Sequence, residues 1–413
     1  MRYTKTSKPL PIFFANLSMR PLSRLIIAIV TLTSMSLCAY AKKDKLPPFK
    51  PQFGPWVTNV TETSFTVLWT TEYDALVSLE VAPGDDGSEF ESAERTSFVE
   101  SVAGRRVTGR YHRITATGLE PGRVYRYRLV GQNVEDDSSA YGTTYGVKKT
   151  IQAKHFIVST IDVGKETCRF SMVNDMHHNL TKFSALMKDV NRDNCDFVVL
   201  NGDITSTSTS LDTTIRHTFE PIAVQCASMP VVYSRGNHEG RGREFYRLPW
   251  MCPTPTGEFY YLFRQGPVAA IVLDAGEDKP DSSSEYSGTA VYDEYRQVQL
   301  EWLKEIVKDP AFKSAPVKIC IMHIPAINDR NSWYSQKWAN KYFLPILNEA
   351  GIMAMFSGHH HKHFVREKGD CGNNFPIVVN SNNERMDFAT DKSGRINLKF
   401  YDVNGTLTHE YNY

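Results

Sequence analysis

The stretch 357–363, Ser-Gly-His-His-His-Lys-His, constrains the fold of this chain more than any other feature. It follows the apolar run 351–356, which is typical of a short buried strand. Imidazoles placed directly after such a strand lie at the carboxyl edge of a sheet, where open α/β sheets bind ligands. His359 and His361 are two residues apart, so on extended backbone they point to the same side. Imidazole is a common metal ligand, and a solvated histidine-rich loop is the alternative.

The amino terminus has the pattern of a secretory signal peptide, expected over 1–41. The apolar segment 25–37 is too short to span a bilayer comfortably, two arginines precede it, and the small-x-small sequence Ala-Tyr-Ala ends at Ala41. We expect an exported chain, periplasmic or extracellular, that is cleaved near Ala41 and has no transmembrane segment once mature. Translation is expected to start at Met19 rather than Met1. A lipoprotein signal through Cys38 is the weaker alternative.

Length and composition leave room for several folded parts. A chain of 413 residues suggests two or three domains, and a net charge of +1 argues against a general nucleic-acid or acidic-membrane binder. One of the seven cysteines leaves with the signal peptide, and the remaining even number permits disulfides in an exported chain. We expect Cys168–Cys195 and Cys226–Cys252 as pairs and Cys320 as a buried thiol. The oligomeric state stays open.

The sequence after a basic linker at 42–54 is all-β in pattern. Over 55–150, polar and apolar residues alternate in Ser64–Trp69, Leu76–Val81 and Arg123–Leu129, with turn residues between them. This pattern predicts an immunoglobulin-like β-sandwich. The Leu-Glu-Pro-Gly-Arg-Val-Tyr-Arg-Tyr stretch that starts at residue 119 resembles the corner of fibronectin type III modules, with the tryptophan of the first of these strands in the core.

After a second linker at 151–165, strands alternate with helices, which predicts an α/β domain over 166–413. The expected strands are Arg169–Val173, Phe197–Leu200, Val231–Tyr233, Gly266–Leu273 and Val317–Met322. The expected helices are Leu180–Asn191, Glu294–Lys308, with Val298, Trp302, Leu303 and Ile306 on one side, and Asn340–Glu349.

Polar motifs follow five of the strands expected in this domain. They are Asn174-Asp175-Met176-His177-His178, Asn201-Gly202-Asp203, Gly236-Asn237-His238-Glu239, Met322-His323 and Gly358-His359-His360-His361. Taken alone, each motif is equally consistent with an ordinary turn or with a histidine in the core. Asp203 is expected beside Asp175, and two such carboxylates repel unless a cation lies between them. The mixed nitrogen and oxygen donors predict two bridged ions, Zn²⁺, Mn²⁺, Fe²⁺ or Ni²⁺ rather than Ca²⁺ or Mg²⁺ alone.

The order D-x-H, G-D, G-N-H-E, a lone histidine after a strand and G-H-x-H resembles the calcineurin-like metallophosphoesterases over roughly 169–380. With the preceding β module, the layout is similar to purple acid phosphatases. The resemblance implies an α/β (α+β multidomain) protein whose sandwich precedes a four-layer α/β/β/α domain. It implies a first ion on Asp175, His177, Asp203 and His361, and a second on Asp203, Asn237, His323 and His359.

The resemblance also assigns roles beyond the ligands. His238 would face the phosphoryl group without binding metal, and Glu239 would orient His238. Purple acid phosphatases have an iron-binding tyrosine three residues after the bridging aspartate, where this chain has Ser206. We therefore expect a colourless enzyme with two divalent ions and a near-neutral to alkaline optimum.

The sequence thus predicts an exported phosphomonoesterase that hydrolyses phosphate esters by in-line attack of a metal-bridging hydroxide, with catalytic roles for Asp203, Asn237 and His238. The alternatives are a phosphodiesterase or nucleotide hydrolase with the same ions, and a surface-binding protein with an inert site. No nucleic-acid-binding module is expected. Candidate substrate contacts are Arg241, Arg243, His178 and the loops 328–338, with Trp333 and Tyr334, and 380–385. The two aromatic residues are expected either to stack on a substrate ring or simply to pack.

Overall fold

The computed structural model describes residues 46–84, 88–139, 141–150 and 155–413, and residues 48–413 form one unit. The expected signal peptide lies outside the described residues. Among the helices that the structure describes, none is both long and apolar enough to cross a membrane.

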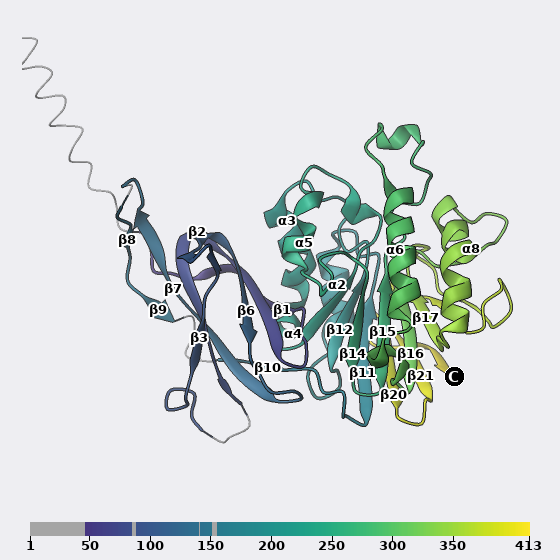
Figure 1. Ribbon diagram of the computed structural model, residues 1–413, viewed down its shortest axis with the longest axis horizontal. Coiled ribbons are helices and arrows are strands. Elements are labelled where there is room, and N and C mark those ends of the chain that lie inside the picture. The colour runs from purple at the N-terminus through teal and green to yellow at the C-terminus, as the bar shows by residue number, and fades with distance from the viewer. Residues whose placement is uncertain (1–45, 85–87, 140, 151–154) are drawn as a thin grey trace, which may run out of the picture. The chain divides into compact units, whose positions relative to one another are not determined.

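The amino-terminal part is built from β-strands (Figure 1). The two strands expected at 64–69 and 76–81 form one long strand, β2, whose register against β6 shifts between Thr70 and Ala75. Trp69 is fully buried, as expected for a core tryptophan. β1 begins at Pro51 and β10 starts at Phe156, inside the two stretches expected as linkers. The strands are β1 Pro51–Thr58, β2 Ser64–Pro83, β3 Thr96–Phe98, β4 Ser101–Val102, β5 Arg105–Arg106, β6 Thr108–Thr117, β7 Val124–Asp136, β8 Thr144–Tyr145, β9 Lys149–Thr150 and β10 Phe156–Ser159.

Two sheets contain the remaining strands, and the first of them also includes strands of the amino-terminal part. The first has the order β10-β7-β2-β1-β13-β12-β11-β20-β21-β22, in which β1 pairs in parallel with β13. The second has the order β14-β15-β16-β17-β19-β18. Their strands are β11 Thr167–Val173, β12 Phe197–Asn201, β13 Pro230–Ser234, β14 Tyr261–Gln265, β15 Val268–Leu273, β16 Val317–Met322, β17 Ala354–Ser357, β18 Phe364–Arg366, β19 Ile377–Val379, β20 Glu384–Asp391, β21 Ile396–Asp402 and β22 Leu407–Asn412.

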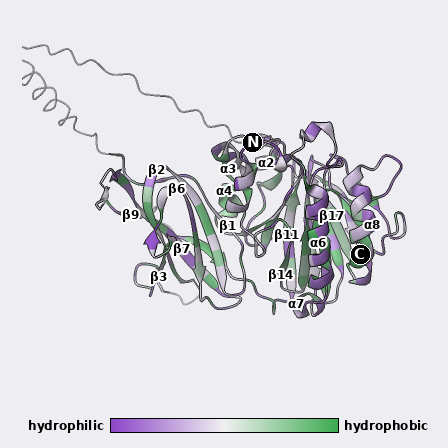
Figure 2. Ribbon diagram, turned by 45° about the horizontal axis from the view of Figure 1, so that its top comes forward, coloured by the Kyte–Doolittle hydropathy of each residue, from purple (hydrophilic) through white to green (hydrophobic). Residues whose placement is uncertain are grey.

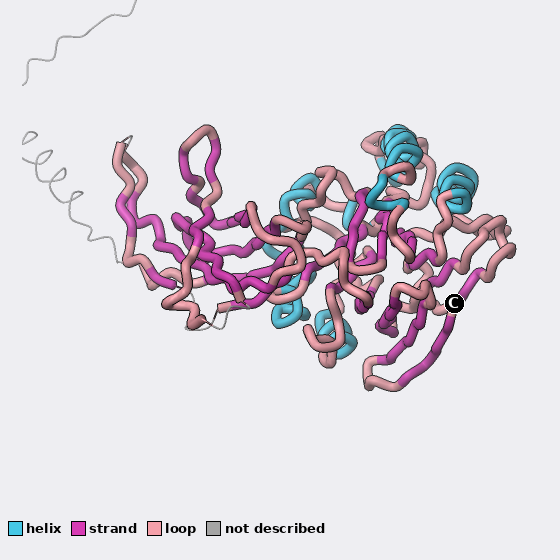
Figure 3. The backbone as a smooth tube through the Cα atoms, turned by 60° about the horizontal axis from the view of Figure 1, so that its bottom comes forward, coloured by secondary structure: helices cyan, strands magenta, loops and turns pink. Residues whose placement is uncertain are grey.

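Helices cover the outer faces of these sheets (Figure 3). One apolar core lies between the two sheets and contains Phe170, Phe197 and Phe356. A second lies under α2 to α5 and a third under α6 and α8, so the layers run α/β/β/α, which confirms the expected fold class. The helices are α2 Leu180–Met187, α3 Leu211–Phe219, η1 Glu220–Ile222, α4 Ala223–Cys226, η2 His238–Gly240, η3 Phe245–Arg247, α5 Leu248–Met251, η4 Ser284–Tyr286, α6 Tyr292–Ile306, α7 Pro310–Lys313 and α8 Tyr334–Glu349.

The expected apolar face of α6 is partly wrong. Val298 is 55% exposed, whereas Arg296, two residues earlier and so on the opposite side of the helix, is fully buried. The Arg296 guanidinium donates to the carbonyl oxygens of Ala275 and Glu277, so hydrogen bonds replace apolar packing there. The hydrophilic outer surface of α6 and the apolar strands behind it are visible in Figure 2.

The cysteines form no disulfide in the described part of the chain, so the two expected pairs are wrong. Cys168 lies on β11, whereas Cys195 lies just before the neighbouring strand β12, and its thiol donates to the carbonyl of Phe197. Cys226 points to the carbonyl of Pro55 instead of to Cys252. Five of the six described thiols are buried, and Cys320 is among them, as expected.

Candidate metal centre

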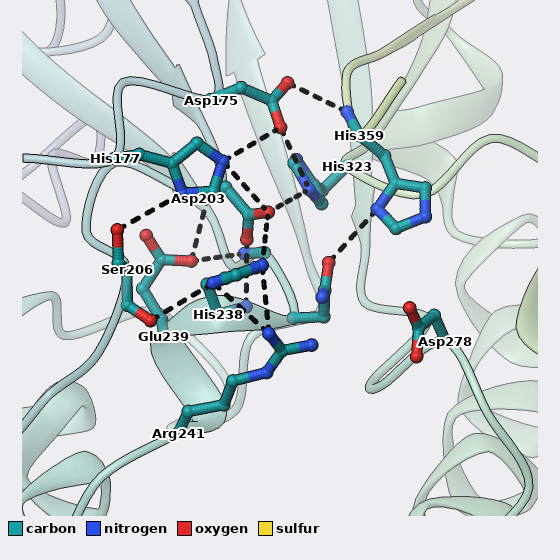
Figure 4. A network of polar contacts seen from close by, with 12 residues as sticks. Asp175, His177, Asp203, Ser206, His238, Glu239, Arg241, Asp278, His323 and His359 are labelled. Atoms are coloured by element: carbon teal, nitrogen blue, oxygen red, sulfur yellow. Dashed lines mark hydrogen bonds and ion pairs between the residues drawn. The ribbon is translucent and has the colours of Figure 1, made fainter. Parts of the chain in front are cut away.

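The five polar motifs meet where parallel strands of both sheets end (Figure 4). Strands β11, β12 and β13 lead into three of them, and β16 and β17 of the second sheet lead into the other two. The structure brings all seven predicted ligands together there; we call them the metal centre. They are Asp175, His177, Asp203, Asn237, His323, His359 and His361.

One half of the metal centre surrounds Asp175. His361 Nε2 lies 3.2 Å and His177 Nε2 lies 3.8 Å from Asp175 Oδ1. The two imidazole nitrogens are 3.1 Å apart, and their ring planes make an angle of 65°. His177 Nε2 also lies 3.8 Å from Asp203 Oδ2, which places Asp203 between the two halves.

The other half surrounds Asp203. His323 Nε2 lies 3.2 Å from Asp203 Oδ2 and 3.8 Å from Asp175 Oδ1. His359 Nδ1 lies 3.1 Å from Asn237 Oδ1, and the rings of His359 and His323 are 82° apart. Each half therefore combines carboxylate oxygen with imidazole nitrogen, the donor set of a transition-metal site.

The donor atoms that face inward are left without hydrogen bonds. Asp175 Oδ2 accepts from the Asn174 amide and from the His359 backbone N–H, but its buried Oδ1 makes no hydrogen bond among the described residues and lies at ion-pair distance from His361. His323 Nδ1 donates to the carbonyl of Asn201, and its buried Nε2 makes no hydrogen bond within the described chain and lies at ion-pair distance from Asp203. Burial of polar atoms without hydrogen bonds is costly, so these residues fit a metal ion.

The backbone at this edge is bent rather than extended. Asp175, His177, Asp203, His359 and His361 all have positive φ, between 47° and 72°. The expectation that the two C-terminal histidines align on extended backbone is therefore wrong. Conformations of this kind cluster at functional sites because the surrounding structure must hold them.

Close packing explains why residue 236 at this edge is a glycine. A Cβ atom at Gly236 would lie 2.2 Å from Asp203 Oδ1, so any side chain there would displace the bridging carboxylate.

Burial and charge set the protonation of the imidazoles. Burial disfavours charge on His323, but the carboxylates of Asp203 and Asp175 outweigh it and raise its pKa to about 10. Burial, together with the charge of His323, lowers the pKa of His359 to about 3, and burial lowers that of His177 to about 4. A metal ion would take the place of the proton that His323 holds between the carboxylates.

His238 lies beside the metal centre in one defined tautomer. Arg241 Nη1 lies 3.0 Å from His238 Nε2 and can only donate, so this nitrogen accepts. The proton is then on Nδ1, which donates to the carbonyl of Ser206 at 3.1 Å. Its Nε2 lies 3.9 Å from Asp203 Oδ2, and the side chain is 29% exposed, so the ring faces both the centre and solvent.

Glu239 does not orient the His238 ring, contrary to the expectation. Its carboxylate accepts the backbone N–H groups of Asp203, Thr205 and Gly236. Burial and the nearby Asp203 charge raise the pKa of Glu239 to about 7. Glu239 therefore holds the backbone that carries the bridging aspartate.

The three candidate substrate contacts lie in different environments. Arg241 reaches the centre, but its Nε and Nη2 bind the Glu277 carboxylate at 2.7 and 2.9 Å, which leaves only Nη1 for a substrate. Arg243 is exposed and donates to the carbonyl of Thr209. His178 accepts the Ser206 backbone N–H and lies 2.6 Å from a nitrogen of His217. Its role is to hold the loop after β12.

The loop 380–385, a candidate for substrate selection, is buried at its two ends. Asn380 is fully buried and donates its side-chain amide to Asn174 Oδ1. Arg385 is 8% exposed and binds Asp387 and the carbonyl of Leu186. Between them Asn383 is exposed, and the Ser381 hydroxyl lies 3.4 Å from the carbonyl of His361, so a role of this loop in substrate selection stays a prediction.

A second group of metal-binding side chains lies after the histidine-rich loop; we call it the histidine–glutamate clamp. It consists of His363, Glu384 and His409. Glu384 Oε1 lies 3.1 Å from His409 Nδ1, and Oε2 lies 3.4 Å from His363 Nδ1. The two rings stack with centroids 3.9 Å apart and an interplanar angle of 8°. His363 Nε2 also lies 2.9 Å from the Tyr411 hydroxyl.

Sequence reasoning missed a sixth strand end. β15 leads into Asp274-Ala-Gly-Glu-Asp-Lys279, and Glu277, Asp278 and Lys279 all lie near the centre or Arg241. Glu277 and Asp278 are 3% and 5% exposed. The signal was present, because this acidic run follows an apolar strand as the other motifs do.

Comparison with known families agrees with this geometry. The family model described as calcineurin-like phosphoesterase matches residues 168–363, and that described as the purple acid phosphatase N-terminal domain matches residues 51–146. No curated protein matches the chain.

Two matching solved structures have low sequence identity to this chain. The structure of purple acid phosphatase PPD1 from yellow lupin (Lupinus luteus) seeds shares the fold, with a TM-score of 0.60 and 14% identity over 87% of this chain and 73% of that one. GAP50, the anchor in the inner membrane complex of Plasmodium, has a TM-score of 0.43 and 17% identity, over 60% of this chain and 88% of that one. By the two family models, the chain has a calcineurin-like phosphoesterase domain, a metal-dependent phosphatase in class, after a purple acid phosphatase N-terminal domain.

Proposed function

We propose that the chain binds two divalent ions through the seven side chains of the metal centre and hydrolyses phosphate esters there. The observation that carries this proposal is the convergence of these donors from five strand ends, in which the buried Asp175 Oδ1 and His323 Nε2 make no hydrogen bond within the described residues. When bound, two such ions supply Lewis-acid activation of water and neutralise charge on the phosphoryl group. The first would lie on Asp175, His177, Asp203 and His361, and the second on Asp203, Asn237, His323 and His359.

His238, Asn237 and Arg241 are the groups placed to handle the phosphoryl oxygens. Asn237 directs its Oδ1 to His359, which leaves its NH₂ group as a donor. Arg241 Nη1 and His238 Nε2 face each other. A phosphoryl oxygen that enters between them would accept the hydrogen bond that Arg241 Nη1 now donates to His238 Nε2. His238 must then gain a proton at Nε2 before it donates to the leaving group.

Phosphomonoesters are the substrates we propose, because a terminal phosphoryl group carries more charge than a diester and Arg241 adds a cationic donor beside the ligands. The test compares p-nitrophenyl phosphate with bis-p-nitrophenyl phosphate after metal reconstitution, with Asp203→Ala as the blank. Preference for the monoester supports the proposal. Preference for the diester would replace it with the phosphodiesterase alternative, and no Asp203-dependent turnover of either ester would contradict hydrolysis.

The ions are proposed to be divalent, drawn from manganese, iron, zinc and nickel, and the enzyme colourless. Ser206 lies where a tyrosine ligand would be needed, and its hydroxyl is 3.5 Å from His177 Nδ1. A serine hydroxyl gives no phenolate-to-iron absorption. We expect a visible spectrum without a charge-transfer band when the protein is loaded with iron in air; a purple preparation would contradict this assignment.

Export is a separate part of the proposal and rests on the sequence of residues 1–41. We expect a mature amino terminus at Lys42, after cleavage at Ala41. Amino-terminal sequencing of the native protein checks this, and intact-mass analysis of a variant with a blocked cleavage site separates Met19 from Met1 as the start. A mature chain that retains the apolar segment 25–37 would contradict cleavage.

A further inference from the structure

An exposed tryptophan lies at the edge of the metal centre. Trp333, directly before α8, is 42% exposed, and its ring centroid is 6.1 Å from that of His359, at an interplanar angle of 77°. A single exposed aromatic residue is ordinary on a protein surface. This one touches a proposed metal ligand, so its exposed surface lies beside the point where a substrate would bind.

The backbone that carries Trp333 is held by its neighbours. The Trp333 backbone N–H donates to Gln336 Oε1 at 2.8 Å, and the Gln336 amide lies 2.6 Å from His360 Nε2. Gln336 is fully buried. The next residue, Tyr334, donates its hydroxyl to Asp293. The point from which the indole extends is therefore fixed, which reduces the entropic cost of ordering this rim around a substrate.

A cation completes this rim from the loop after β15. Lys279 Nζ lies 5.3 Å from the centroid of the Trp333 ring and is held by Glu285 at 2.7 Å. Because Glu285 and Asp278 both lie within ion-pair distance of Lys279, the rim adds little net charge. What it offers a ligand is chiefly a flat aromatic surface.

We propose that Trp333 is a specificity-determining residue that stacks on a planar ring in the leaving group of the phosphate ester. The inference rests on the proposed function, since it needs the phosphoryl group to lie at the metal centre. A nucleobase and an aryl group share this chemistry, because each presents a flat π-surface to the indole. Esters without a ring would gain nothing from Trp333.

The test measures kcat and KM for three esters: p-nitrophenyl phosphate, adenosine 5′-monophosphate and the ring-free glycerol 3-phosphate. Trp333→Ala should raise KM for at least one ring-bearing ester by about tenfold, the scale of losing one stacking contact, and leave glycerol 3-phosphate unchanged. Trp333→Phe should restore most of the loss. Which of the two ring-bearing esters responds identifies the kind of ring.

The matched control is Tyr342→Ala, because Tyr342 lies on α8, which Trp333 directly precedes, is 37% exposed and packs on Trp338. It should change none of the three KM values. Equal effects of Trp333→Ala on all three esters, or no effect on any, would overturn the inference while wild-type turnover of glycerol 3-phosphate still supports the proposed function. Loss of metal in Trp333→Ala but not in Trp333→Phe would make the ring a support for His359 and would also overturn it.

Discussion

The metal centre and the histidine–glutamate clamp contain the same kinds of side chain but differ in the orientation of their rings. In both, imidazole and carboxylate donor atoms lie within 4.8 Å of one another. In the centre, paired rings cross at 65° and 82°, whereas the two rings of the clamp are within 8° of parallel. An imidazole nitrogen binds a metal along the lone pair in its ring plane. The lone pairs of two stacked, nearly parallel rings run side by side, so they do not converge on one ion.

The difference teaches that proximity of metal-binding residues does not by itself make a metal site. The clamp instead uses Glu384 to face two imidazole nitrogens and ties the end of the histidine-rich loop to β22. Among the described residues, Asp175 Oδ1 and His323 Nε2 of the centre make no hydrogen bond, and neither do His363 Nδ1 and Glu384 Oε2 of the clamp, so the distinction rests on the orientation of the rings. We therefore expect changes in the centre to remove metal and activity, and changes in the clamp to reduce stability.

The largest expected effect is that of Asp203→Ala, which should release both ions and abolish turnover. Asp203 faces ligands of both halves, with His323 at 3.2 Å and His177 at 3.8 Å, and is the carboxylate assigned to both ions. Metal content after dialysis, measured by plasma mass spectrometry, checks this result. Retention of either ion in the variant would contradict the bridging role.

His238→Ala should keep both ions and lower kcat by about 10²–10⁴-fold, the usual contribution of a positioned acid or base. The ring lies beside Asp203 but its Nε2 is engaged by Arg241. Steady-state kinetics and metal analysis on the same sample separate the two effects. If the variant lost metal together with activity, His238 would belong to the centre as a ligand.

Removal of the ions with a chelator should lower the thermal midpoint of the wild-type protein. Without them, the carboxylates of Asp175 and Asp203 stay buried close together. Ligand present at a hundred times its dissociation constant stabilises a folded protein by about 2.7 kcal/mol. Calorimetry before and after addition of Mn²⁺ or Zn²⁺ measures the shift, which Asp203→Ala should not show.

A smaller loss of stability is expected from Glu384→Gln in the clamp. The change removes a buried charge that faces His363 and His409, at a cost of about 1–3 kcal/mol. Metal content should stay at two ions per chain, and activity should stay near that of wild type. A third ion in the wild-type protein that disappears in Glu384→Gln would break the distinction between the two clusters.

The sequence was sufficient for the fold class and for the place of the site. Apolar strands followed by Asp, Asn or His identify the residues that meet at a sheet edge, because parallel strands end together. The positive φ of His359 and His361 was not predictable from their spacing, since tertiary contacts hold that bend.

Some partners could not be predicted, for a physical reason. Glu239 binds backbone N–H groups and Arg241 binds Glu277, and such hydrogen bonds depend on loop paths rather than on local pattern. The exposure of Val298 was not predictable because the buried face of α6 carries Arg296 instead, whose guanidinium donates to backbone carbonyl groups.

Because β1 pairs in parallel with β13, the amino-terminal module and the domain that starts at residue 166 share one sheet and do not form two independent units. All five residues of β13 are buried, and Trp56 donates its indole N–H to the carbonyl of Met251. A catalytic domain produced without the amino-terminal module would expose this strand as an open edge, with free N–H and C=O groups that invite pairing with other chains. The amino-terminal module thus covers this edge of the sheet, and its removal is expected to promote aggregation.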